Sequence, residues 1–357
     1  MAFLSALLLS GVPSAAALAR PLARAAPRAR AMLSTAARPP LHLYTAERCV
    51  LHDAGGGHPE SPERLASLLR LARGEWTADF GASLVVLEPE VEATDEHLTR
   101  VHTPRMVAGL RSAFAAAVSR QATLSLDADT RVNPSSGPAA LRAAGLVVAA
   151  VDEVLSPASA TKRAFVMARP PGHHAEPDMP MGFCLFNSIC VGLAHAQAVH
   201  GVKRVALLDF DVHHGNGGQA ICTADPSRFF ASSHQSPCYP GTANKQGRFG
   251  VAEQVIIAPL KPGAGSAPFR AAWADQILPA LREFGPEMIF VSAGFDAHEA
   301  DELASLNLHE EDFEWVTRAI IEAAGPSVPV VSYLEGGYNI PALGASVRAH
   351  VKAMIEA

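Results

Sequence analysis

The chain has 357 residues, of which 49% are hydrophobic and 18% are charged, and its formal net charge is -6 at pH 7. This composition supplies enough apolar residues for a full core and excludes a disordered or fibrous protein. The negative balance gives no global basic field, so we expect neither nucleic acid nor a membrane as a direct partner. Composition leaves the oligomeric state open.

The first forty residues have the composition of an organelle-targeting presequence. No acidic residue occurs before Glu47, and five arginines are spaced through alanine, serine and proline. We therefore assign residues 1–40 to a presequence and expect a mitochondrial location. The apolar start MAFLSALLLSGVPSAAA also fits a bipartite plastid address, and the nucleus or cytoplasm remains if the presequence is not used.

From residue 41 onward, strand and helix patterns alternate. Short apolar runs rich in β-branched residues predict strands at 164–168, 204–210, 228–233, 287–294 and 328–337. Amphipathic patterns predict helices at 61–72, 137–155, 188–199, 267–284, 309–324 and 342–357. Apolar strands separated by helices predict one α/β domain over 41–357, with three layers and a mainly parallel sheet flanked by helices.

The five cysteines contain no CxxC pair and are odd in number, which argues against a disulfide scaffold in a chain of this size. We expect buried free thiols. The glycine-rich patch GAGSAP at 263–268 lacks the GxGxxG spacing of a nucleotide-binding turn and is interpreted as a loop.

Four predicted strands end in turns rich in polar residues. These turns read RPPGHHAEPDMPMGFCLFN, DVHHGNG, FDAH and EGGYN. Because parallel sheets bind ligands at the carboxyl ends of their strands, we expect the four turns to meet at one edge.

Asp209, Asp211 and His213 alternate along the end of one predicted strand and therefore share a face. Asp296 follows a second strand and can add a third ligand to Asp211 and His213. Two carboxylates and one imidazole suit a borderline divalent ion and leave a coordination position open, which is typical of a catalytic site. By the same alternation, His214 points away from the metal.

His173 and His174 are adjacent in the first of the polar turns. Asp209 and Asn216 on the facing loop can tune the two imidazoles differently, so that they divide general-base and general-acid work. Tyr338 follows two glycines that let the backbone approach a ligand, and its phenol can bind a developing oxyanion.

These motifs, in this order, resemble the zinc-dependent histone deacetylase family, and more closely its class II and bacterial histone-deacetylase-like amidohydrolase branch. The resemblance runs from about residue 50 to the end and rests on the segments HDAGGGHPESPERL, LDADTRVNPSSGPAALRAAG, RPPGHHAEPDMPMGFCLFN, LDFDVHHGNG, SPCYPGT, SAGFDAH and LEGGYN. It implies the arginase/deacetylase fold and hydrolysis of acetyl or other acyl groups from lysine side chains of proteins or peptides.

The resemblance also implies roles for single residues. One zinc ion would be held by Asp211, His213 and Asp296, and a potassium ion by Asp209, Asp211, His213 and the backbone around Ser232 and Ser233. His173 and His174 would be the acid/base pair, supported by Asp209 and Asn216, and Tyr338 would polarise the substrate carbonyl. The substrate-binding residues would be Phe183, Tyr239, Gly182, Gly337 and Leu303, the first two as aromatic tunnel walls.

Two positions depart from the family pattern, and both would lie near the pocket mouth. Glu302 stands where the family commonly has proline in DPL, and Ala243 stands where PGTG has its last glycine. Acetylpolyamine-specific relatives carry a glutamate at the position of Leu303, so acyl-lysine is the first expectation and acetylpolyamine the alternative.

Two further alternatives come from other classes of protein. A dimetal ureohydrolase of the arginase type would need an aspartate at the position of Gly215. A non-catalytic acyl-lysine binder would not need the histidine pair and Tyr338.

Overall fold

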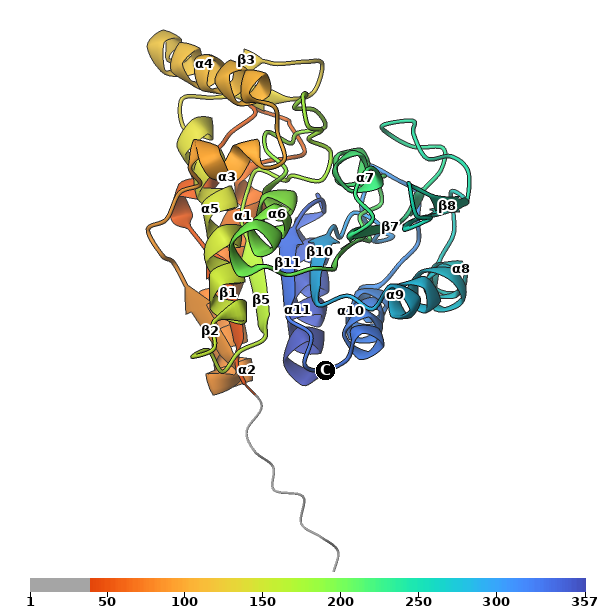
Figure 1. Ribbon diagram of the computed structural model, residues 1–357. Helices are drawn as coiled ribbons and strands as arrows, with labels where there is room; N and C mark the ends of the chain where they lie inside the picture. The colour runs from red at the N-terminus through yellow and green to blue at the C-terminus, as the bar shows by residue number, and fades with distance from the viewer. Residues whose placement is uncertain (1–38) are drawn as a thin grey trace, which may run out of the picture. The chain divides into compact units, whose positions relative to one another are not determined.

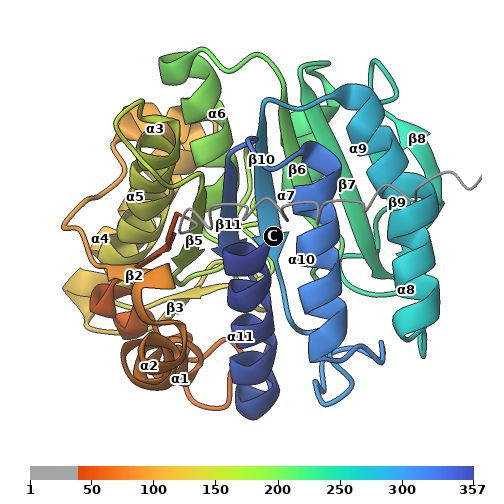
Figure 2. The same ribbon diagram turned by 90° about the horizontal axis from the view of Figure 1, so that it is seen from below.

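A nine-stranded sheet forms the centre of residues 39–357, which are the residues that the computed structural model describes (Figures 1 and 2). The strand order is β2-β1-β5-β11-β10-β6-β7-β9-β8, and neighbouring strands are parallel except for the last pair, β9 and β8. The strands are β1 Leu41–Thr45, β2 Leu84–Leu87, β5 Arg163–Met167, β6 Val205–Asp209, β7 Arg228–Gln235, β8 Gly247–Phe249, β9 Val255–Leu260, β10 Met288–Ala293 and β11 Val330–Leu334. A separate two-stranded ribbon consists of β3 Leu124–Ser125 and β4 Arg131–Val132.

Helices cover the sheet on both faces, because its central strands are apolar on both sides. Helix α5 packs against α6 and against β5, whereas α11 packs between α1 and α10. Figure 2 shows α10 and α11 in front of the central strands. The helices are α1 Pro62–Leu71, α2 Thr77–Phe80, α3 Asp95–Thr99, α4 Pro104–Arg120, α5 Ser136–Leu155, α6 Ser188–His200, α7 Asn216–Thr223, α8 Ser266–Ala272, α9 Leu278–Phe284, α10 Glu310–Ala324 and α11 Ile340–Glu356.

The predicted fold class is confirmed: a mostly parallel sheet lies between two helical layers. Each of the five predicted strands and six predicted helices is present, with ends that differ from the prediction by a few residues. The sequence patterns did not identify the strands β1, β2, β3, β4, β8 and β9 or the helices α2, α3, α4 and α7. The helix predicted over 267–284 contains a π-helical turn at Trp273–Ile277. This turn ends two residues before Pro279, which has no amide hydrogen to donate to the preceding turn.

The five cysteines are free thiols, as expected, and four of them are buried. The patch at 263–268 consists of a turn and the first residues of α8, which begins at Ser266. Residues 1–38 of the expected presequence lie outside the described residues. Within the described part, no helix combines the length and apolarity needed to cross a membrane.

Candidate active site

The four polar turns predicted from the sequence follow β5, β6, β10 and β11, which are adjacent in the sheet. Asp209 at the end of β6 is level with Ser292 of β10, and Ala293 of β10 is level with Leu334 of β11. The strands are parallel and in register, so their carboxyl ends deliver the four turns to one edge of the sheet. The expected convergence is present.

Asp211, His213 and Asp296 come together with their ligand atoms within 4.8 Å of one another. His213 Nδ1 lies 3.1 Å from Asp211 Oδ1 and 3.1 Å from Asp296 Oδ2. Both carboxylates are almost completely buried. Burial and the nearby charge of Asp211 raise the pKa of Asp296 to about 6. Although burial alone would lower it, bonds to the two carboxylates raise the pKa of His213 well above its usual value.

Two glycines pack the backbone directly against these carboxylates. A Cβ atom at Gly294 would lie 2.0 Å from Asp211 Oδ2, and one at Gly336 would lie 2.1 Å from Asp296 Oδ2. Side chains are therefore sterically excluded behind the carboxylates. Two carboxylates and an imidazole in this buried cradle fit a divalent cation, whose charge would compensate the two buried acids.

The two adjacent histidines have different partners, as predicted. His173 Nδ1 lies 3.0 Å from Asp209 Oδ2, whereas His174 Nδ1 lies 2.8 Å from Asn216 Oδ1. Although burial alone would lower it, the carboxylates of Asp211 and Asp209 raise the pKa of His173 to about 10. Burial and the neighbouring His173 lower the pKa of His174 well below its usual value. One imidazole is thus held cationic and the other neutral at physiological pH.

The hydrogen bond to Asn216 also assigns the tautomer of His174. The carbonyl oxygen of the Asn216 side chain accepts from Nδ1, and its amide donates to Glu176 Oε1 at 2.7 Å. Nδ1 of His174 therefore carries the proton, and Nε2 has a free lone pair. Since His174 lines the cavity, this lone pair is available to a bound molecule.

A cavity of about 210 Å³ opens above the metal-ligand cluster. Phe183 and Tyr239 form two aromatic walls, and Tyr239 packs edge-on against His174 with ring centres 5.1 Å apart. Gly182 has a φ of 56° and allows a close approach, because a Cβ there would lie 2.5 Å from His174 Cδ2. The full lining is Asp129, His174, Gly182, Phe183, His213, Tyr239, Leu303 and Tyr338.

Gly337 is the one residue of the expected substrate-binding set that the cavity lining does not include. A Cβ at Gly337 would face Leu343 and Phe295, and its φ is 119°. This glycine thus shapes the turn that presents Tyr338. Burial, with the charge of Asp296, raises the pKa of Tyr338 and keeps its phenol protonated.

Two charged residues that support this turn were not assigned any role from the sequence. Arg64 donates to the carbonyl oxygens of Gly337 and Glu335 at 2.6 and 2.5 Å. Asp301 Oδ2 accepts from the amides of Tyr338 and Asn339, at 2.6 and 3.1 Å. For the contacts of Arg64, the one signal in the sequence was the HPESPERL motif, which contains this residue.

Beneath Arg64 lies Glu60, which is fully buried. Its carboxylate accepts from Arg64 Nη1 at 3.1 Å and forms a two-pronged ion pair with the buried Arg169. Glu335 in turn accepts the amides of Gly172 and His173 at 2.6 and 3.2 Å. The histidine turn and the tyrosine turn are therefore held by one buried polar network.

The side chains of Ser232 and Ser233 are engaged away from Asp209. Ser232 Oγ bonds to His234 Nδ1 at 2.9 Å, and Ser233 Oγ accepts from Trp273 Nε1 at 2.9 Å. A potassium ion here would have to be bound by backbone carbonyls and Asp209, and no contact of these residues supports one. His214 bonds to Thr242 and Gln219 at 2.7 Å each, away from the metal cluster.

The position that would carry the second-metal aspartate of a ureohydrolase has no room for a side chain. A Cβ at Gly215 would lie 2.0 Å from Asp209 Oδ2. The local packing therefore requires glycine and disfavours a two-metal site of that type.

Comparison with known proteins agrees with this geometry. Residues 58–354 match the model of the histone deacetylase domain. The chain is 35% identical over 325 residues to "Histone deacetylase 14, chloroplastic" of Arabidopsis thaliana, covering 88% of this chain and 76% of that protein. It is 38% identical over 309 residues to the "Histone deacetylase-like amidohydrolase" of Pseudomonas aeruginosa, covering 82% and 77%.

Among solved structures, the crystal structure of the HDA15 HD domain superposes with a TM-score of 0.80 at 29% identity, covering 89% of this chain and 88% of that one. The fold, the matched domain and the bacterial and plant relatives agree with one another. The chain belongs to the histone deacetylase family of hydrolases.

Proposed function

We propose that the chain is a zinc-dependent amidohydrolase that removes acetyl or other acyl groups from lysine side chains of proteins or peptides. The observation that carries this proposal is a pair of adjacent imidazoles, one bonded to a carboxylate and one to an amide, beside three side chains that can bind a metal ion. His173 bonds to Asp209 and His174 to Asn216, and the two rings are 4.0 Å apart.

Asp211, His213 and Asp296 would hold the zinc ion. Their donor set, two carboxylates and one imidazole, leaves coordination positions for substrate and water. A zinc ion bound there supplies Lewis acidity, which polarises a carbonyl and makes water more acidic.

The residues around the Asp211 cluster have separate roles in proton transfer and in the stabilisation of charge. His174 is neutral and offers Nε2 to the cavity, so it takes the proton from the attacking water and passes it to the leaving amine. The carboxylates of Asp211 and Asp209 raise the pKa of His173, so this imidazole carries a proton and stabilises negative charge that develops during the attack. The phenol of Tyr338 donates a hydrogen bond to the substrate carbonyl oxygen as it becomes an oxyanion.

The cavity supports an acyl-lysine as the substrate. Its aromatic walls, Phe183 and Tyr239, suit the apolar stem of a lysine side chain, and Leu303 completes the wall near the mouth. An amide at the end of such a stem would reach His174 and Tyr338 at the bottom.

An acetylpolyamine is the second candidate substrate, because Glu302 is adjacent to the position at which polyamine-specific relatives carry glutamate. In this chain, however, Leu303 lines the cavity, whereas Glu302 lines the neighbouring surface groove. At the position where polyamine-specific relatives carry glutamate, the cavity has leucine, and Asp129 is the acidic residue of its lining. Acyl-lysine therefore remains the first proposal.

For location, we propose the plastid rather than the mitochondrion. The support is the Arabidopsis relative, whose name includes "chloroplastic", together with the acid-free, arginine-containing start of this chain. Imaging of the full chain with a carboxy-terminal fluorescent fusion tests this: signal in mitochondria alone would contradict it.

The substrate is tested by comparing an acetyl-lysine peptide with N8-acetylspermidine on the zinc-loaded full chain. We expect the higher kcat/KM for the peptide. A clear preference for the polyamine would overturn the acyl-lysine proposal, and hydrolysis of neither substrate, with tight binding of the acyl peptide, would identify a non-catalytic binder. Two metal ions bound at the Asp211 cluster would instead favour a ureohydrolase.

A further inference from the structure

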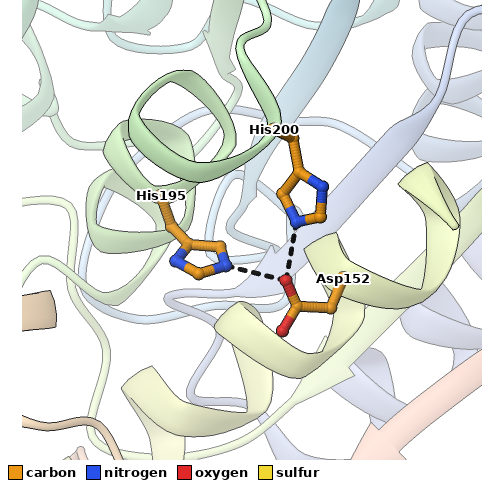
Figure 3. Close-up of side chains that lie close together, drawn as sticks. All are labelled: Asp152, His195 and His200. Carbon is orange, nitrogen blue, oxygen red and sulfur yellow. Dashed lines mark hydrogen bonds and ion pairs between the residues drawn. The ribbon is translucent and has the colours of Figure 1, made fainter.

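A second group of metal-ligating side chains lies outside the candidate active site. Asp152, near the end of α5, points toward His195 and His200 of α6 (Figure 3). The same carboxylate oxygen, Oδ1, is 2.7 Å from Nε2 of His195 and 2.7 Å from Nε2 of His200. All three ligand atoms lie within 4.8 Å of one another.

The group is at the opposite edge of the sheet from the active site. Helices α5 and α6 end at Leu155 and His200, just before β5 and β6 begin, whereas the active-site turns follow the ends of those strands. Both helices therefore direct their carboxyl ends, which carry partial negative charge, toward the edge where the group lies. This field favours a bound cation over an anion.

The donor types select the class of ion. Two imidazoles and one carboxylate suit zinc and similar transition-metal ions, whereas magnesium and calcium prefer oxygen ligands alone. The side chains of Asp152 and His200 are 51% and 25% exposed, so an ion can enter from solvent and complete its coordination with water.

Arg100 opposes metal binding at this place. Its Nη1 lies 2.9 Å from Nδ1 of His195, and a guanidinium group only donates hydrogen bonds, so Nδ1 must accept and Nε2 must carry the proton. A metal at Nε2 would move that proton to Nδ1, where it would meet the Arg100 donor. Arg100 also donates to Glu96 at 2.8 Å, so it retains a partner if it leaves His195.

We propose that Asp152, His195 and His200 form a second divalent-metal site, which takes zinc or a similar ion and links α5 to α6. Arg100 weakens this site by competing for His195. The site is independent of the proposed catalysis, because it shares no residue with the Asp211 cluster.

The test counts zinc on the full chain after equilibration with micromolar ZnCl2. The wild type should hold two zinc ions per chain, one at each site. Asp152→Asn keeps an oxygen that can accept both Nε2–H hydrogen bonds, but an amide oxygen is a poor metal ligand. The variant therefore distinguishes metal binding from a purely hydrogen-bonded contact between α5 and α6. We expect Asp152→Asn and His200→Ala to hold one zinc ion, with unchanged deacylase activity.

Glu153→Gln is the matched control, because it removes a neighbouring carboxylate outside the group, and it should keep two zinc ions. Arg100→Ala should bind the second zinc about tenfold more tightly, the scale on which neighbours of metal ligands change affinity. Zinc should raise the melting temperature of the wild type by more than it raises the melting temperature of Asp152→Asn. A wild type that binds no more zinc than Asp152→Asn would overturn the proposal, whatever the zinc content of the Asp211 cluster.

Discussion

The amide of Gly336 donates a hydrogen bond to Oδ2 of Asp211 at 2.9 Å. The turn that carries Tyr338 is therefore attached to a proposed metal ligand, and the position of the phenol depends on that of the carboxylate. This contact requires glycine, because a Cβ at position 336 would lie 2.1 Å from Asp296 Oδ2 and 2.7 Å from Asp211 Oδ2.

Gly336→Ala should accordingly displace both carboxylates and lower zinc affinity and deacylase activity by at least about tenfold. Zinc content after dialysis and kcat/KM measure the two effects. Gly109→Ala in α4 is the control, because no atom lies within 4 Å of a Cβ there, and it should change neither quantity. Full zinc retention by Gly336→Ala would show that a Cβ at position 336 does not displace the two carboxylates.

Asp209→Asn should shift the pH dependence of catalysis. The asparagine oxygen can still accept from His173 Nδ1, but the charge that helps to raise the pKa of His173 to about 10 is lost. The pKa of His173 therefore falls, and the cation is lost at lower pH. We expect the alkaline limb of the pH profile of kcat to move to lower pH. An unmoved limb would contradict the proposal that protonated His173 stabilises negative charge during catalysis.

Glu60→Gln should destabilise the fold strongly. The buried Glu60 carboxylate compensates Arg169 and Arg64, and its loss leaves both guanidinium groups without their buried anion. Breaking such a pair costs about 3 kcal/mol or more in the free energy of unfolding.

Urea titration of Glu60→Gln measures this cost, and Glu63→Gln is the control. Glu63 pairs with Arg70 on the surface at 2.6 Å, so its loss should cost less than about 1 kcal/mol. Equal costs for the two variants would contradict the view that the buried network is required.

Protonation of His102 should make the fold less stable in mild acid. Its Nδ1 bonds to the carbonyl of Glu176 and its Nε2 accepts the amide of Asn187, each at 2.9 Å, so the ring fits only in the neutral form. Burial lowers the pKa of His102 to about 4. Between the unfolded value of about 6.5 and this value, the unfolded chain binds more protons, so stability falls as pH falls.

The contribution of His102 is on the order of 3 kcal/mol between pH 7 and pH 4. Urea titrations at several pH values measure it, with His102→Gln as the comparison, because glutamine supplies one donor and one acceptor but does not titrate in this range. The wild type should lose more stability than the variant over this range. Parallel losses would assign the acid sensitivity to other groups.

The fold class and the reacting groups could be predicted because both depend on local sequence patterns. Alternating apolar strands and helices predicted the sheet, and the carboxyl ends of its strands predicted where Asp211, His173 and Tyr338 would meet. The strands β1 and β2, at one edge of the sheet, were missed.

The residues that hold the site could not be predicted in the same way. Arg64 and Gly337 are 273 positions apart in the chain, and no local pattern connects them. The sequence patterns assigned no role to Asp301, although its carboxylate accepts a hydrogen bond from the amide of Tyr338. Such contacts depend on how distant segments pack in three dimensions.

The most direct test of the proposed chemistry is the rate at which zinc-loaded Tyr338→Phe hydrolyses an acetyl-lysine peptide. The variant keeps the ring that packs against Phe183 and loses only the hydroxyl, so zinc content and stability should remain. We expect kcat to fall by about a hundredfold or more, the scale of losing one oxyanion donor. Hydrolysis at the parental rate with one zinc ion bound at the Asp211 cluster would contradict the proposed mechanism.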